Sequence, residues 1–158
     1  MKITTKFLVR AALIAAVYAT LTLILEAFGF GPVQFRLAEA LTVLPAIMPA
    51  SIPGLFIGCI LANWLGGFGV ADIVFGSLAT LLAGISTYLL RNHKWLYPLP
   101  PVVFNGLIVG SYIYILYDKT YPLPLTILFI AISESVLSYG IGLPLISFIK
   151  KNKGLRSS

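Results

Sequence analysis

The chain has 158 residues, of which 59% are hydrophobic and only 10% are charged, and its mean hydropathy is +0.98. A soluble domain of this length needs more charged side chains to cover its surface, so this composition indicates that apolar faces meet lipid. The net charge is +6. Because the basic residues lie at the edges of apolar segments and not on one patch, we expect no nucleic-acid binding.

The first apolar segment follows Lys2, Lys6 and Arg10, an arrangement that is also typical of a signal peptide. Residues 7–28, however, are long enough to cross a bilayer, and no cleavage site of the A-x-A kind follows them. We therefore expect a helix over 7–28 that is retained in the membrane.

The stretch between Glu39 and Asp72 holds 32 uncharged residues. As one helix it would be about 48 Å long, which exceeds a single bilayer span. Three prolines interrupt it, and proline removes a backbone donor and clashes with the preceding helical turn. We expect two short helices instead, over 37–49 and 54–66.

Three further apolar segments predict helices over 72–91, 96–117 and 123–149. The orientation follows from nine of the eleven Lys and Arg, which form three clusters: Lys2, Lys6 and Arg10; Arg91 and Lys94; Lys150, Lys151, Lys153 and Arg156. Short basic loops stay in the cytoplasm, so an even number of spans must separate each pair of clusters. The predicted fold is a single all-α integral membrane domain, 1–158, with six transmembrane helices and both termini cytoplasmic.

Glu134 is the residue that most needs an explanation. A charged side chain near the bilayer centre costs about 2.5–3.5 kcal/mol on insertion scales, so it should face the bundle interior or a cavity. There it binds a ligand or carries a proton, or it is a neutral acid whose hydrogen bonds hold helices together. We favour a functional role, because intramembrane carboxylates usually have one.

Other polar groups are predicted in the outer or middle part of the bundle. Asp72 follows a glycine-rich turn and opens a helix, where it either caps that helix or lies beside a ligand. Arg36 and Glu39 are three residues apart, and they form a surface ion pair or part of a ligand site. Four more candidates lie in otherwise apolar helices, where they bridge helices, mark the interface or contact a ligand: Asn63, Trp64, Asn105 and Tyr112. Together these groups suit a planar, hydrogen-bonding ligand that can carry a positive charge.

The first helix has small residues on two neighbouring faces, Ala11 with Ala15 and Ala12 with Ala16. Small residues four apart let another helix pack closely, either within the chain or from another subunit. The sequence offers no catalytic motif: its one histidine has no second ligand for a metal, and a Walker A motif is missing. We expect no enzymatic activity, no metal and no cofactor, and we interpret Cys59 as a packing residue.

Several segments resemble a known family. Residues 10–19 (RAALIAAVYA) resemble the opening helix of the substrate-binding S-components of energy-coupling-factor (ECF) transporters. Residues 31–42 (GPVQFRLAEALT), 53–63 (PGLFIGCILAN) and 66–81 (GGFGVADIVFGSLATL) closely resemble the QueT family, which is assigned to the uptake of queuosine precursors. The resemblance implies a six-helix S-component in a prokaryotic plasma membrane, with a ligand pocket near the outer face. It further implies a separate membrane coupling subunit, contacted through the alanine faces of the first helix, and two cytoplasmic ATPase subunits.

The implied ligand agrees with the polar residues. A queuosine precursor is a deazaguanine base with ring N–H and amine donors, and its aminomethyl form adds a cation. We expect Glu39, Asp72 or Glu134 to accept hydrogen bonds from these groups. The assisting candidates are Gln34, Asn63 and Asn105.

Three alternatives remain open at this point. The chain is an S-component for another vitamin-like ligand, or a standalone proton-coupled carrier with Glu134 as the titrating group, or a scaffold or intramembrane enzyme. Six short helices without an obvious internal repeat are unfavourable for a standalone carrier. Transport that survives loss of ATP and of the coupling subunit would favour the carrier.

Overall fold

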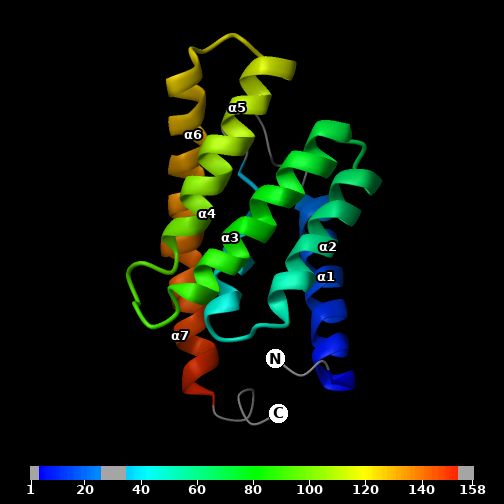
Figure 1. Ribbon diagram of the computed structural model, residues 1–158, viewed down its shortest axis with the longest axis vertical. Helices are drawn as coiled ribbons and strands as arrows, with labels where there is room; N and C mark the ends of the chain where they lie inside the picture. Colours follow the sequence, from blue (N-terminus) through cyan, green and yellow to red (C-terminus); the bar gives the residue numbers. More distant parts are fainter. Residues whose placement is uncertain (1–3, 26–34, 153–158) are drawn as a thin grey trace.

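The computed structural model describes residues 4–25 and 35–152, and the regular structure in these two ranges is helical throughout (Figure 1). The predicted all-helical fold is therefore confirmed. The helices are, in chain order, α1 (Thr5–Leu25), η2 (Leu37–Ala46), α2 (Ser51–Leu65), η3 (Asp72–Gly76), α3 (Ser77–Leu89), α4 (Leu99–Phe104), η4 (Asn105–Val109), α5 (Gly110–Tyr112), η5 (Ile113–Tyr117), α6 (Leu123–Ser135), η6 (Val136–Gly142) and α7 (Leu143–Lys151). η2 is a tight 3₁₀ helix, whereas the other η segments are wider π-type turns that continue neighbouring α-helices.

Four continuous stretches are long and apolar enough to cross a membrane: Thr5–Leu25, Asp72–Leu89, Leu99–Tyr117 and Leu123–Lys151. They coincide with four of the helices expected from the sequence. The structure describes the first stretch to Leu25, so its predicted end at residue 28 lies outside the described residues. A chain with several such helices is a multi-pass membrane protein.

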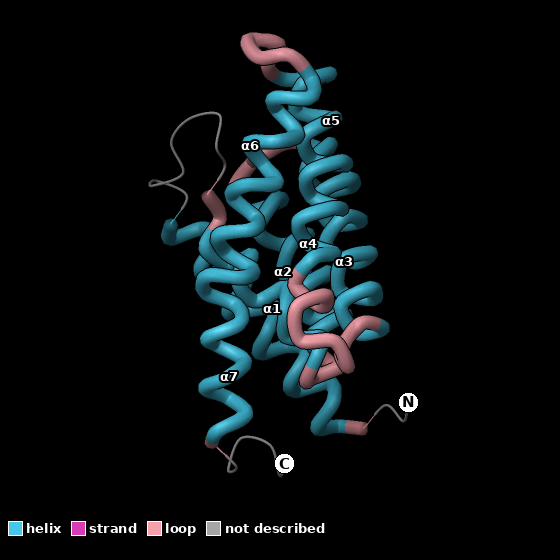
Figure 2. The backbone as a smooth tube through the Cα atoms, turned by 90° about the vertical axis from the view of Figure 1, so that its left-hand side faces the viewer, coloured by secondary structure: helices cyan, strands magenta, loops and turns pink. Residues whose placement is uncertain are grey.

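The two remaining helices, η2 and α2, are apolar but short. The 10 residues of η2 rise about 20 Å and the 15 residues of α2 about 22 Å, both less than a hydrocarbon core of about 30 Å. Six crossings with both termini cytoplasmic therefore stay a prediction. In Figures 1 and 2, α1 begins and α7 ends at one end of the bundle, as an even number of crossings requires, and the turn before α6 lies at the other end.

The break between η2 and α2 falls where the prolines predicted it, but α2 begins at Ser51, three residues before the expected start. Pro53 then occupies the first turn of α2. In a first turn the backbone N–H groups have no acceptor within the helix, so the N–H that proline lacks is not missed. The helix can therefore begin before Pro53 instead of after it.

α1 and α2 lie side by side (Figure 1). They pack closely because glycines on α2 face the backbone of α1. A Cβ atom added to Gly54 would lie 2.7 Å from the carbonyl oxygen of Ala11, and one added to Gly58 would lie 2.9 Å from that of Ala15. Ala11 and Ala15 are buried in this contact, whereas Ala12 and Ala16 are exposed on the neighbouring face of α1. One of the two predicted alanine faces thus serves packing inside the chain, and the other remains at the surface.

η2 lies at the centre of the bundle. It packs against α1, α2, α3, α4, η6 and α7, and eight of its ten residues are buried. Surrounded on all sides, a helix must be apolar all round except where a polar side chain finds a partner. Glu39 is the one acid in η2, so its surroundings define the site described next.

Candidate functional site

A narrow cavity of about 20 Å³ lies between η2 and the helices around it. It is lined by Arg36, Glu39, Cys59, Gly76, Thr80, Asn105, Val109, Ile130 and Glu134. These side chains come from six helical segments, η2, α2, η3, α3, η4 and α6, together with Arg36 just before η2. The cavity has room for about one water molecule, and its wall carries two carboxylates, a guanidinium and an amide.

Glu39 is held by two other helices. Its exposed fraction is only 4%, the hydroxyl of Tyr18 on α1 donates a hydrogen bond to its Oε1, and the Nδ2 of Asn105 on η4 donates to its Oε2 over 3.4 Å. The bond from Asn105 is long, so Oε2 of Glu39 is only weakly hydrogen-bonded. Glu39 is therefore anchored at one oxygen and available at the other.

Glu134 is buried on α6 with an exposed fraction of 5%, and its Oε2 has no hydrogen-bond partner among the described residues. A buried polar atom without a partner costs about 1–3 kcal/mol, more if it is charged, so such atoms call for an explanation. Glu134 lines the same cavity as Glu39, so two carboxylates share one small space. A donor or a cation placed there would stabilise both.

A second group of polar side chains adjoins the cavity through Arg36. Its Nη2 lies 3.1 Å from Oδ1 of Asp72, its Nη1 donates to Oδ1 of Asn63 over 3.3 Å, and its guanidinium stacks 4.9 Å from the centre of the Phe68 ring. Tyr112 donates to the same Asp72 oxygen over 2.8 Å, and the Asn63 amide donates to the Asp72 backbone carbonyl, also over 2.8 Å. This network ties together the start of η2 with α2, η3 and α5.

The interpretation of Arg36 and Glu39 as a surface ion pair is wrong. Arg36 pairs with Asp72, thirty-six residues away, and Glu39 is buried against Tyr18. The reason is the direction of η2: it places residue 39 inside the bundle, whereas Arg36 lies before its first turn. Spacing along the chain therefore does not identify the partner of either residue.

A glycine turn places Asp72 in this network. Gly67 and Gly69 have φ angles of 68° and 111°, a region that favours glycine because it has no Cβ. A Cβ on Gly69 would also lie 2.6 Å from the hydroxyl oxygen of Tyr117. The turn lets the chain reverse after α2 and start η3 with Asp72 facing inward, where its exposed fraction is 3%.

The structure brings together seven of the nine predicted ligand-site residues: Arg36, Glu39, Asn63, Asp72, Asn105, Tyr112 and Glu134. Trp64 does not join them, because it is 66% exposed on the outer side of α2, a position typical of an aromatic residue at the membrane interface. Gln34 lies outside the described residues.

Sequence reasoning missed Tyr18, Thr80 and Cys59. Tyr18 had a usable signal, since it lies three residues after Ala15 and so shares the small-residue face of α1 that packs inward. Thr80 donates a weak hydrogen bond to the Cys59 sulfur over 3.6 Å. Nothing in the sequence marked these two residues as neighbours.

Comparison with known proteins identifies the family of the chain. A family model described as "QueT transporter" matches residues 8–151. The "Queuosine precursor transporter QueT" of Lactococcus lactis subsp. cremoris (strain MG1363) is 36% identical over 77 residues, which is 48% of this chain and 45% of that relative, so the match spans less than half of the relative's length. No solved structure matches. The family model covers nearly all of the described helices, including every residue of the polar cavity, and the chain therefore belongs to the QueT transporter family.

Proposed function

We propose that the chain is the substrate-binding S-component of an ECF-type importer and that its ligand is a queuosine precursor, a 7-deazaguanine base. The observation that carries this proposal is Oε2 of Glu134, which has no hydrogen-bond partner among residues 4–25 and 35–152 and lies in a cavity that also holds Glu39 and Asn105. Family membership and the name of the Lactococcus relative support the ligand class.

The chemistry of the base fits the carboxylates. The guanine-like edge presents a ring N–H and an exocyclic amine side by side, and a carboxylate accepts two parallel hydrogen bonds from such a pair. Glu134 has a free oxygen for one of these donors, and Glu39 has an oxygen whose bond to Asn105 is long and easily exchanged. The Asn105 amide offers a donor and an acceptor to the ring edge, and an aminomethyl ammonium group would be neutralised by the second carboxylate.

The cavity must widen to hold this ligand. Its volume of about 20 Å³ suits one water, whereas small-molecule pockets are on the order of 300 Å³ or more. Arg36 lines the cavity and its side chain is 18% exposed, so Arg36, held by its ion pair with Asp72, is the part of the wall nearest to solvent. We infer that the ligand enters past Arg36 and that this ion pair rearranges when the ligand binds.

The sequence has no Walker A motif, so in this proposal ATP is hydrolysed by other subunits. The proposed partners are a membrane coupling subunit and two ATPase subunits. Ala12 and Ala16 form the exposed small-residue face of α1, so they are the proposed contact with the coupling subunit, whereas Ala11 and Ala15 already contact α2. Small side chains at this face would let a partner helix approach closely.

Equilibrium binding to the detergent-purified chain tests the ligand. The 7-aminomethyl and 7-cyano forms of 7-deazaguanine are titrated, with guanine and several vitamins as competitors. Tight binding of a precursor that guanine does not match supports the proposal. Binding of one vitamin and of no precursor would leave an S-component with another substrate.

Two matched substitutions test the site. Glu134→Gln removes the free carboxylate oxygen, and we expect precursor affinity to fall by about 5- to 150-fold, the equivalent of about 1–3 kcal/mol. Asp118→Asn makes the same chemical change in the exposed turn before α6 and should leave affinity unchanged. Equal affinity of the Glu134→Gln variant and the wild-type chain would remove Glu134 from the site.

Uptake by cells or proteoliposomes tests the energy source. Import that requires the coupling subunit and the ATPases supports the S-component assignment. Import by this chain alone, driven by a pH gradient, would instead identify a proton-coupled carrier.

A further inference from the structure

A second, larger pocket lies at the end of the bundle where α1 begins and α7 ends. Its volume is about 400 Å³. The wall consists of the turn between η2 and α2, the end of α3 and the end of α7: Ala46, Ile47, Met48, Pro49, Tyr88, Arg91, Asn92, Ile149 and Lys150. The proposed ligand site does not share any of these residues.

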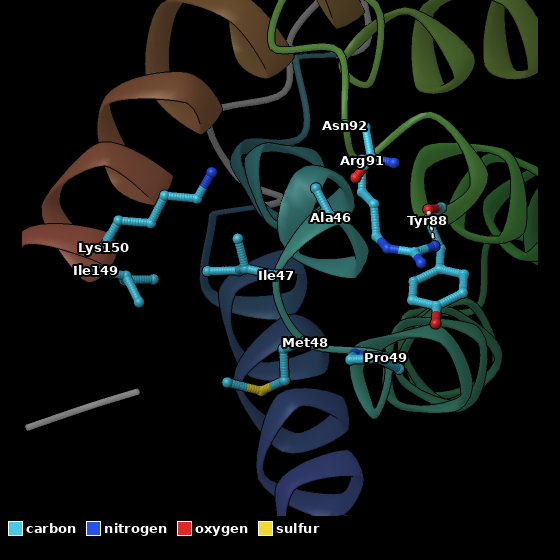
Figure 3. A pocket seen from close by; sticks show the side chains of 9 residues that line it. All are labelled: Ala46, Ile47, Met48, Pro49, Tyr88, Arg91, Asn92, Ile149 and Lys150. Atoms are coloured by element: carbon cyan, nitrogen blue, oxygen red, sulfur yellow. Dashed lines mark hydrogen bonds between the residues drawn. The ribbon is translucent and has the colours of Figure 1, made fainter. Parts of the chain in front are cut away.

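The polar part of this pocket is cationic. Figure 3 shows Arg91 and Lys150 on opposite sides of the turn that carries Ala46 and Ile47. No acidic residue lines the pocket, and the one ion pair among residues 4–25 and 35–152 joins Arg36 to Asp72. The positive charges of Arg91 and Lys150 therefore have no carboxylate partner in the described part of the chain.

Arg91 is already oriented for binding an anion. Its Nη1 donates to the carbonyl of Tyr88 over 3.0 Å, and its guanidinium stacks 4.1 Å from the centre of the Tyr88 ring (Figure 3). A guanidinium has five N–H donors in a planar fork that matches the oxygens of a phosphate, so these contacts leave donors for a ligand. Asn92 adds an amide beside it.

The rest of the wall is apolar, with Ile47, Met48 and Ile149 among its residues. The pocket also lies at the ends of two helical stretches that can cross the membrane, where lipid headgroups are found. A soluble phosphate would leave the apolar wall unused, whereas an anionic phospholipid presents a phosphate next to a glycerol and acyl chains. Basic pockets between transmembrane helices are suited to such headgroups.

We propose that this pocket binds the phosphate of an anionic glycerophospholipid, with Arg91 as its ligand, Lys150 adding positive charge from the other side of the turn, and the apolar wall against the glycerol and the first acyl carbons. The site is independent of the proposed transport ligand, and it would fix one specific lipid against the turn that joins η2 to α2.

The test uses the full chain in a neutral detergent, where no charged membrane surface contributes. Binding of phosphatidylglycerol and of phosphatidylcholine is measured by native mass spectrometry, with inorganic phosphate and glycerol 3-phosphate as soluble competitors. We expect one phosphatidylglycerol per chain to bind in preference to phosphatidylcholine, with little competition from the soluble phosphates.

Three double variants locate the site. Arg91→Gln with Lys150→Gln should lower phosphatidylglycerol affinity about thirty-fold. Lys94→Gln with Lys151→Gln removes two positive charges, as the first double variant does, but next to the pocket instead of in it. This double variant should lower phosphatidylglycerol affinity less than about threefold. Arg91→Lys with Lys150→Arg keeps both charges and should retain binding, which distinguishes a lost site from a misfolded chain.

Three outcomes would overturn the proposal. If the first two double variants lost phosphatidylglycerol affinity equally, the lipid would be attracted by the overall positive charge of this end of the bundle and not by a specific site. Full competition by glycerol 3-phosphate would assign the pocket to a soluble phosphate. Binding of an acidic peptide through Arg91 and Lys150, without a preference for phosphatidylglycerol, would assign it to a protein partner.

Discussion

The ion pair between Arg36 and Asp72 should contribute strongly to stability, and its contribution can be isolated. The two charged atoms are 3.1 Å apart, and the side chains are 18% and 5% exposed. Removing one partner of a buried pair costs about 3–5 kcal/mol, and the partial exposure of Arg36 places this pair near the lower limit, at about 3 kcal/mol. Asp72→Asn keeps an oxygen that accepts the hydrogen bond of Tyr112, so the loss reports mainly on the charge.

A double-mutant cycle separates this pair from the rest of the network. Asp72→Asn and Arg36→Gln should each destabilise the chain by about 3 kcal/mol, and the double variant by only slightly more, because the second substitution removes a charge that has already lost its partner. A loss of about 3 kcal/mol corresponds to a decrease in Tm of about 6–12 °C for a chain of this size. Thermal unfolding of all four proteins in one detergent measures these values.

The exposed Asp118 provides the matched control, because Asp118→Asn makes the same change in a turn and should leave Tm within about 1 °C. Additive effects of the two substitutions, to within about 0.5 kcal/mol, would show that Arg36 and Asp72 act separately. That result would refute the interpretation of the network as one unit.

Three further predictions concern α1. Gly58→Ala places a methyl group about 3 Å from the backbone of Ala15. The substitution should lower the free energy of unfolding by about 1–3 kcal/mol, which thermal unfolding detects as a lower Tm. Tyr18→Phe removes the donor to Oε1 of Glu39 and should destabilise the chain by about 1–3 kcal/mol while also weakening precursor binding in the titration above. Ala16→Leu changes an exposed position and should leave Tm unchanged but reduce co-purification with the coupling subunit, whereas Ala15→Leu should lower Tm.

For each of these predictions, one specific result would contradict it. Gly140 is a helical glycine whose added Cβ would lie 4.0 Å from Cγ1 of Val136, an ordinary contact, so Gly140→Ala serves as the control for Gly58→Ala. Equal Tm values would show that α1 and α2 do not pack as closely as described. Full precursor affinity in Tyr18→Phe would show that the orientation of Glu39 does not matter for binding. Normal assembly of Ala16→Leu would exclude this face as the contact.

The sequence predicted the parts of the fold that depend on local composition. The apolar lengths identified the long helices, and the prolines between Glu39 and Asp72 identified the break before α2. The exact start of α2 was missed, because whether Pro53 ends one helix or lies in the first turn of the next depends on how the chain packs.

The polar residues were predicted as candidates, but not their partners. Glu39 and Asn105 are 66 positions apart, and the pairs of Arg36 with Asp72 and of Tyr112 with Asp72 are similarly remote. Composition shows that a buried acid needs a partner, and it does not show which of several distant donors will supply one. The two alanine faces of α1 posed the same problem, since only the glycines of α2 decide which face is buried.

The winding of η2 has a mechanical consequence. A 3₁₀ helix rises about 2.0 Å per residue and an α-helix about 1.5 Å, so the 10 residues of η2 span about 5 Å more than 10 residues of an α-helix would. Glu39 lies near one end of this segment, and the turn that forms the wall of the second pocket lies at the other. η2 is thus an extended spacer between the interior acid and the opposite end of the bundle, and its 3₁₀ hydrogen-bond pattern sets the distance between them.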